Sequence, residues 1–167
     1  AIAQARIQAL QARIRPHFLY NSINAVLSLI RSEPKRAERA LEDLADLFRV
    51  LMADNRSLTP VAKEIDIARQ YLAIEELRLG ERLRVAWRVE AMPADALVPA
   101  LLLQPLVENA VYHGIEPLVE GGEIAIEVTG TDDEVVIRLT NPFAPAGDRH
   151  AGNRMAIANI RERLQLH

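Results

Sequence analysis

The chain has 167 residues, and half of them are hydrophobic, which suffices for one compact domain or for a helical module joined to a small domain. Its formal net charge of −3 lacks the basic excess that marks nucleic-acid-binding domains, so we expect no nucleic-acid partner. The absence of cysteine excludes disulfides, thiolate chemistry and cysteine-ligated zinc. No apolar run is long enough to span a bilayer.

Residues 1–32 contain arginine but no acidic residue, and they begin in the middle of a helical pattern without an initiating methionine. We therefore expect a longer protein that continues on the N-terminal side. Apolar side chains recur in steps of four, three and four, the spacing of a coiled-coil seam: Ala3, Ile7, Leu10 and Ile14. The next step lands on His17. Pro16 lacks a backbone donor, so the sequence predicts a kink just before this histidine.

Three amphipathic segments follow the proline. An apolar face restarts over Ile23, Val26, Leu27 and Ile30, and Pro34 is suited to open a second helix over 35–55. A third helical pattern covers 61–83 and is expected to end near Gly80. The first two segments predict a helical hairpin within residues 1–58.

The remaining chain mixes strand and helix patterns. Residues 83–90 alternate as a strand does, and 99–117 are a nearly all-apolar helix interrupted by a few polar residues. Residues 122–141 predict two strands joined by a turn near 130–133, followed by a long loop at 142–154 and a final helix at 155–166. We therefore predict an α+β fold with an α/β sandwich over 59–167.

His17 is the first candidate for chemistry. A lone histidine on an apolar seam is more often a core residue or a cap on a kinked backbone. A proline kink can instead turn the side chain outward, and imidazole titrates near neutral pH, so one ring nitrogen is a usable nucleophile. The residues alone leave both interpretations open.

A second candidate site lies in the segment "ENAVYH". Asn109 and His113 are four residues apart and share one face of an ideal helix. An amide oxygen suits Mg²⁺, which takes much of its shell from phosphates and water, while Glu108 can order a water or accept a proton. The alternative is a buried helix with polar residues at its exposed edge.

The loop from 140 to 155 is a third candidate. It contains glycine and leads into a helix whose N-terminal amide groups favour phosphates. Its spacing matches neither a Walker loop nor a dinucleotide fingerprint, and an ordinary surface loop explains it equally well.

Taken together and in order, these segments resemble the LytS/YehU-type sensor histidine kinases. The blocks are "QARIRPHFLYNSIN", "YLAIEELRLGERL", "LLLQPLVENAVYHGI" and "GNRMAIANIRERL", which cover nearly the whole chain. Within the family, the sequence "TNP" and a damaged glycine motif look most like the alginate and pilus regulatory sensors of the AlgZ (FimS) branch. The resemblance implies membrane-anchored dimers, in which a dimerising helical hairpin precedes a Bergerat-type (GHKL) ATP-binding domain.

The resemblance also assigns roles to single residues. It makes His17 the phosphoacceptor of ATP-dependent autophosphorylation and Glu108 a helper in catalysis. Asn109 would hold Mg²⁺, and the nucleotide would be bound by Asn109 and by His113, Asn141, Gly152, Asn153 and Asn159. A response regulator would receive the phosphoryl group. The fragment would be the cytoplasmic part of an inner-membrane protein, attached through a segment preceding residue 1.

Three departures from the family pattern matter. Asn141 stands where family kinases carry an aspartate that binds the adenine amino group, so one acceptor remains but the charge is lost. Arg154 replaces a glycine of the ATP lid, and Phe18 follows the histidine where the commoner kinase class has an acid. The departures motivate an alternative function, a degenerate kinase that acts as a dimeric scaffold or phosphatase for its regulator.

Two further alternatives have less support. A GHKL ATPase that uses Glu108 to activate water would leave the hairpin without a purpose. A zinc site built from His17, His113 and His150 is not indicated by their spacing.

Overall fold

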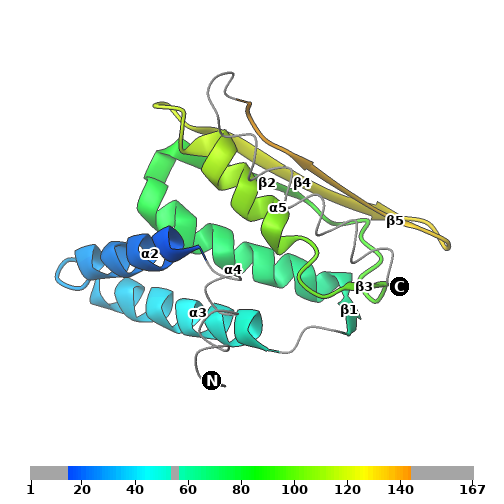
Figure 1. The fold of residues 1–167 in the computed structure, drawn as a ribbon, viewed down its shortest axis with the longest axis horizontal. Coiled ribbons are helices and arrows are strands. Elements are labelled where there is room, and N and C mark those ends of the chain that lie inside the picture. The colour runs from blue at the N-terminus through cyan, green and yellow to red at the C-terminus, as the bar shows by residue number, and fades with distance from the viewer. Residues whose placement is uncertain (1–14, 54–56, 144–167) are drawn as a thin grey trace, which may run out of the picture.

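The structure is a computed structural model that describes residues 15–53 and 57–143 (Figure 1). These residues form a mixed α+β fold. Its helical hairpin consists of α2 (Pro16–Leu29) and α3 (Pro34–Met52), which pack side by side. Both helices begin with a proline, whose missing N–H costs nothing at the first helical position. Arg15 is extended (φ −64°, ψ 124°), as expected before a proline, so the predicted break at Pro16 is here the start of α2.

The hairpin buries one face and exposes another. On α2 the buried residues are four apart: Phe18, Ser22 and Val26. On α3 the buried stripe has the period of a helix and comprises Ala37, Ala40, Leu44, Leu47 and Leu51, whereas Leu41 is exposed. Three of the four apolar residues predicted to restart the face on α2 are exposed as well: Ile23, Leu27 and Ile30. Among the described residues, the hairpin therefore keeps an exposed apolar surface.

Helix α4 (Val61–Leu79) is the central element of the described fold. It contacts α2 and α3 on one side and α5 (Gln104–Asn109) and β2 (Leu83–Arg88) on the other. A helix covered on two sides needs apolar residues around most of its circumference. Its buried residues meet this need: Val61, Ile65, Ile67, Ala68, Tyr71, Leu72, Ile74 and Leu79. Gly80 ends the helix with a positive φ of 58°, as the sequence predicts.

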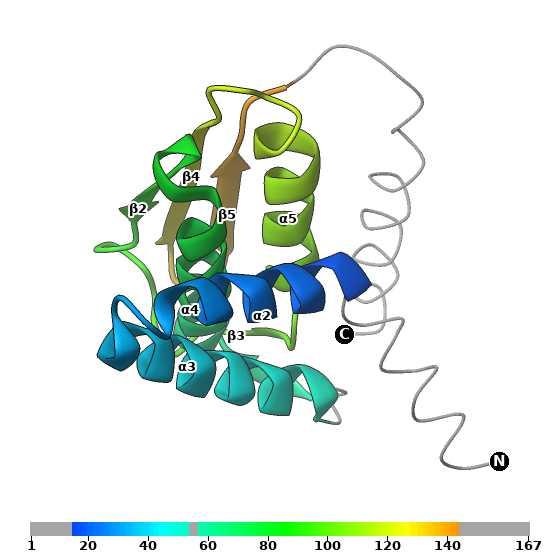
Figure 2. The same ribbon diagram turned by 90° about the vertical axis from the view of Figure 1, so that its left-hand side faces the viewer.

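A three-stranded sheet lies beside α4 and α5, with strand order β2-β4-β5 (Figure 2). β4 (Gly122–Gly130) pairs in parallel with β2 and antiparallel with β5 (Val135–Thr140). Parallel neighbours need a crossover connection, and α5 lies within the one that joins β2 to β4. Every second residue of β4 is buried from Gly122 to Val128, so one face of the strand contributes to the core.

Two very short strands, β1 (Leu58–Pro60) and β3 (Leu97–Pro99), pair antiparallel at the N-terminal end of α4. Beyond β3 the backbone bends sharply at Leu101, whose φ of 57° is unusual for a residue other than glycine. The buried carboxylate of Glu64 accepts hydrogen bonds from the N–H groups of Leu101 (2.7 Å) and Leu103 (3.2 Å). Because α5 begins at Gln104, Glu64 fixes the start of the helix that carries the candidate site.

One buried cluster joins the predicted units. Phe18 and Leu47 of the hairpin, Leu72 of α4 and Ile126 of β4 all belong to it. The helices and strands expected between residues 16 and 141 are present, except that the helix expected over 99–117 begins only at Gln104, after β3 and a turn, and changes into a π-helical turn at Ala110–Ile115. The overall α+β class is confirmed. The boundary between domains 1–58 and 59–167 stays a prediction, as do the Bergerat-type sandwich and the dimerising role of the hairpin.

Candidate functional site

The segment "ENAVYH" lies where α5 changes into a π-helical turn, Ala110–Ile115. The N–H of Glu116 donates to the carbonyl of Val111 (3.0 Å), five residues back. The i to i+4 argument that placed Asn109 and His113 on one face assumes a regular α-helix, so their relation is only approximate here. Single π turns occur frequently at functional sites, where they redirect side chains.

Asn109 is buried at the C-terminal end of α5. The Nη2 of Arg15 donates a hydrogen bond to its Oδ1 (2.8 Å), although 94 positions separate the two residues. The amide nitrogen of Asn109 has no hydrogen-bond partner among the described residues, and neither has Oε1 of Gln104, one turn earlier. Buried polar atoms are normally paired, so α5 retains hydrogen-bonding capacity that a polar ligand can use.

Glu108 is half-buried beside these two amides. Nε2 of Gln104 donates to its Oε1 (3.1 Å). Burial raises the pKa of Glu108, and nearby Glu75 adds to the rise, while the Gln104 hydrogen bond and the Arg15 charge oppose it. The carboxyl group therefore holds a proton more readily than an exposed glutamate does, which suits a group expected to accept a proton or order a water.

Two aromatic rings follow on the π turn. The rings of Tyr112 and His113 are perpendicular, with centroids 4.9 Å apart. The Arg15 guanidinium lies over the Tyr112 ring, 4.5 Å from its centroid. Arg15 therefore contacts both ends of the candidate segment, its amide and its aromatic part.

Asn141 follows β5 and approaches the same helix from the sheet. A Cβ on Gly114 would lie 2.6 Å from Nδ2 of Asn141 and 3.0 Å from the carbonyl oxygen of Pro142, so a residue without a side chain permits this approach. Nδ2 of Asn141 donates to that carbonyl (2.7 Å). One N–H of the amide is thus used by the backbone, and Oδ1 is the atom that can accept a hydrogen bond from a base.

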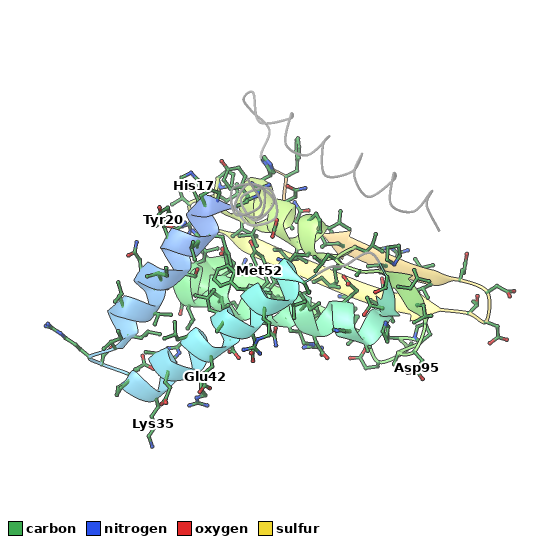
Figure 3. All side chains as sticks on the ribbon, turned by 60° about the horizontal axis from the view of Figure 1, so that its bottom comes forward. His17, Tyr20, Lys35, Glu42, Met52 and Asp95 are labelled. Carbon is green, nitrogen blue, oxygen red and sulfur yellow. The ribbon has the colours of Figure 1, made fainter. Side chains whose placement is uncertain are left out.

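His17 is exposed in the first turn of α2, near Tyr20 on the same helix (Figure 3). Its neighbour Phe18 points into the core, where its ring centroid lies 4.9 Å from that of Tyr71 and 6.4 Å from that of Phe48. Only Pro16 separates His17 from Arg15, which is bonded to Asn109. The structure thus brings the start of α2 to the C-terminal end of α5 within one chain.

A buried ionic cluster lies behind the site. Arg78 pairs with Glu75 on the same helix and with Glu116 beyond the π turn. Burial raises the pKa of Glu75 despite the Arg78 charge, and burial with the charges of Glu75 and Glu108 raises that of Tyr71. The cluster ties α4 to the segment that carries His113.

Several predictions fall outside the described residues: the candidate nucleotide residues Gly152, Asn153 and Asn159, the lid residue Arg154, and His150. Within residues 15–53 and 57–143, no cluster of three or more His, Cys, Asp or Glu side chains is arranged to hold a metal ion. No helix in those same ranges combines the length and apolar character needed to cross a membrane.

Sequence reasoning missed three residues that shape this site: Arg15, Tyr112 and Glu64. Arg15 counted only as one of several N-terminal arginines, and no sequence spacing connects it with Asn109. Tyr112 was enclosed in the quoted motif without a role. A glutamate in the first turn of an apolar helix is the only signal for Glu64, and it equally fits a helix-dipole contact.

Comparisons with known proteins show what the chain is similar to. A family model described as histidine kinase matches residues 5–83, a range that includes His17, the hairpin and α4. The chain is 32% identical to the sensor histidine kinase YpdA of Escherichia coli and 32% identical to the sensor protein LytS of Oceanobacillus iheyensis. The chain is therefore similar to sensor histidine kinases, LytS among them, over nearly its whole length.

A third relative, the sensor histidine kinase YesM of Bacillus subtilis, is 31% identical. The alignments cover 98%, 98% and 99% of this chain, but the chain spans only about 30% of the length of each of these relatives. The region that the family model matches does not include residues 104–143. The alignment with YpdA nevertheless covers 98% of this chain.

Proposed function

We propose that this chain is the cytoplasmic core of a two-component sensor histidine kinase that binds Mg²⁺·ATP and phosphorylates itself on His17. The observation that supports this most is the Arg15–Asn109 contact, because it brings the exposed histidine near the helix expected to hold the nucleotide. A response regulator would then take the phosphoryl group from His17. The protein would be attached to the inner membrane through a segment preceding residue 1, as the family resemblance implies.

The nucleotide would lie between α5 with its π turn and the end of β5. Asn109 would supply an amide oxygen to Mg²⁺, and the buried amide atoms of Asn109 and Gln104 would gain partners. Asn141 would accept a hydrogen bond from the adenine amino group, with His113 close to the phosphates. Gly152, Asn153 and Asn159 would complete the site. Bound Mg²⁺ would neutralise charge on the phosphates during transfer.

The chemistry asked of the protein is mainly positioning. A ring nitrogen of neutral His17 would attack the γ-phosphorus, the bond to the bridging oxygen would break, and ADP would leave. The ring proton of the resulting phosphoimidazolium can pass to water, because His17 is exposed. Glu108, whose pKa burial raises, would order a water or take a proton in the site.

Labelling with γ-labelled ATP and magnesium tests this proposal. We expect label on the protein that survives base, is lost in acid and disappears in His17→Gln. A matched control is His167→Gln, which changes another histidine of the chain. Equal labelling of His17→Gln and the unchanged protein would overturn the role of His17.

A second candidate is a degenerate kinase that acts as a dimeric scaffold or phosphatase for its regulator. Its support is the exposed apolar face of α2, where Tyr20 is 67% exposed and Leu27 58%. Such a face could bind a second copy of the chain without any nucleotide. The substitutions at Asn141 and Arg154 also favour it, and they motivate placement near the alginate and pilus regulatory branch. Calorimetry separates the candidates, because a scaffold would bind neither ATP nor ADP at millimolar concentration.

A further inference from the structure

The side chain of Arg15 does not stabilise α2, so its placement has another cause. It is the N-cap of that helix, yet its side chain makes no capping hydrogen bond. A cation near the positive end of the helix dipole is unfavourable. The guanidinium instead donates to Oδ1 of Asn109 and stacks on Tyr112, so its placement is explained by the helix 94 positions away.

The contact uses the atom that the proposed function assigns to Mg²⁺. An amide oxygen that accepts a hydrogen bond from a guanidinium along one lone pair, with Asn109 buried, offers little room for a divalent cation. Two cations side by side at this oxygen would also repel each other. Arginine and metal should therefore exclude one another at Asn109.

We propose that Arg15 is a resident cation that occupies the metal position of Asn109 until Mg²⁺·nucleotide displaces it. This inference rests on the proposed function for the identity of the displacing ligand. Displacement would free the backbone just before Pro16 and so loosen the first turn of α2, where His17 lies. Nucleotide binding and the presentation of the histidine would thus be linked through one side chain.

The Arg15 charge also supports the resting state of the site. The guanidinium places a positive charge directly at the Asn109 amide, 2.8 Å from Oδ1. When Arg15 leaves, a metal would have to replace its charge. The exchange of one cation for another keeps the site close to electrically balanced, whereas nucleotide without metal would add only negative charge. Nucleotide alone should therefore displace Arg15 poorly.

The contact itself can be tested without nucleotide. Urea unfolding of Arg15→Ala, Asn109→Ala and the double variant forms a double-mutant cycle. We expect the folding equilibrium constant of the double variant to differ by about fivefold or more from the product of the single effects. As a control, Arg36→Ala combined with Asn109→Ala should be additive, because Arg36 is exposed and pairs with Glu33. An additive Arg15–Asn109 cycle would overturn the contact.

Calorimetry with a non-hydrolysable ATP analogue and magnesium tests the displacement. Without the competitor, Arg15→Ala should bind about tenfold more tightly, Arg15→Lys should fall between, and Arg36→Ala should match the unchanged protein. Weaker binding by Arg15→Ala would overturn the proposal and indicate that the arginine contacts phosphate. If neither the variants nor the unchanged protein binds the analogue, the proposed function is overturned. If the protein binds the analogue but the Arg15–Asn109 unfolding cycle is additive, only the role of Arg15 is overturned.

Discussion

Glu64 and Asn109 are both buried and polar, yet their surroundings differ. Glu64 belongs to α4 and its side chain lies at the start of α5, whereas Asn109 is the last residue of α5. Each carboxylate oxygen of Glu64 accepts a backbone N–H, from Leu101 and from Leu103. The Asn109 amide has one bonded atom, its oxygen, and a nitrogen without a partner among the described residues. A buried group whose polar atoms are all hydrogen-bonded within its own chain stabilises the local backbone conformation. One with spare hydrogen-bonding capacity is available to a ligand.

The difference also explains why a substitution of Glu64 is tested by unfolding, whereas a substitution of Asn109 is tested by ligand binding. Glu64 compensates for a strained backbone, since Leu101 has the positive φ that a branched side chain adopts only under constraint. The unpaired amide nitrogen of Asn109 destabilises the folded state, and a hydrogen bond from it to a ligand would offset this cost. A change at the first should lower stability, and a change at the second should lower binding.

The largest expected effect is that of Glu64→Ala. It removes the acceptor of two buried N–H groups and should lower the free energy of unfolding by about 3 kcal/mol, because each unsatisfied donor costs roughly 1–3 kcal/mol. Urea denaturation measures the change, with the exposed α3 residue Glu42→Ala as control (Figure 3). A loss as small as that of the control would show that the turn at Leu101 holds without Glu64.

Asn109→Ala should have the opposite profile. We expect the free energy of unfolding to change by less than about 1 kcal/mol, since an orphaned buried atom is removed together with one hydrogen bond. The affinity for Mg²⁺·ATP should fall more than about tenfold, or about 1.4 kcal/mol. Unfolding and calorimetry on the same variant measure both values. Severe destabilisation with unchanged affinity would reverse the comparison.

The smallest effect concerns the ionic cluster behind the site. Burial raises the pKa of Glu75 above its ordinary value of 4.5, so the folded state holds this proton more tightly than the unfolded chain does. The contribution of Glu75 to stability is complete below pH 4.5 and declines as pH rises towards the raised pKa. In Glu75→Gln this decline should disappear.

The measurement is the difference in unfolding free energy between the unchanged protein and Glu75→Gln, followed upward from pH 4. The slope should be negative in this window and no steeper than about 1.4 kcal/mol per pH unit, the limit for one proton. A positive slope would mean that the pairing with Arg78 dominates over burial.

Local periodicity predicted the longer helices and the three longer strands because these elements are long enough to repeat their patterns, but it did not predict how the strands pair. Ile65, Ala68, Leu72 and Glu75 are all buried on α4, as their spacing indicates. The two three-residue strands β1 and β3 were not predicted, since so few residues show no period and their pairing joins distant parts of the chain.

The candidate site was predicted unevenly. Residue types and spacing singled out His17 and Asn109 but left their roles open, whereas the resemblance supplied those roles and pointed to Asn141. The structure brings Asn141 against Gly114 and the start of α2 against Asn109, but it does not test their roles. The π turn was not predictable from composition. Nor was the contact of Arg15, because a long flexible cation can reach many partners and only the packed fold selects one.

The pairing of exposed His17 with buried Phe18 constrains how phosphorylation could be regulated. The two side chains are neighbours, and the phenyl ring is wedged among Phe48 and Tyr71. Rotating α2 to swing the imidazole elsewhere would pull that ring into water, at roughly 2–3 kcal/mol. Under the proposed function, an upstream signal would therefore need less free energy to move the expected nucleotide-binding segments relative to α2 than to rotate α2 as a whole.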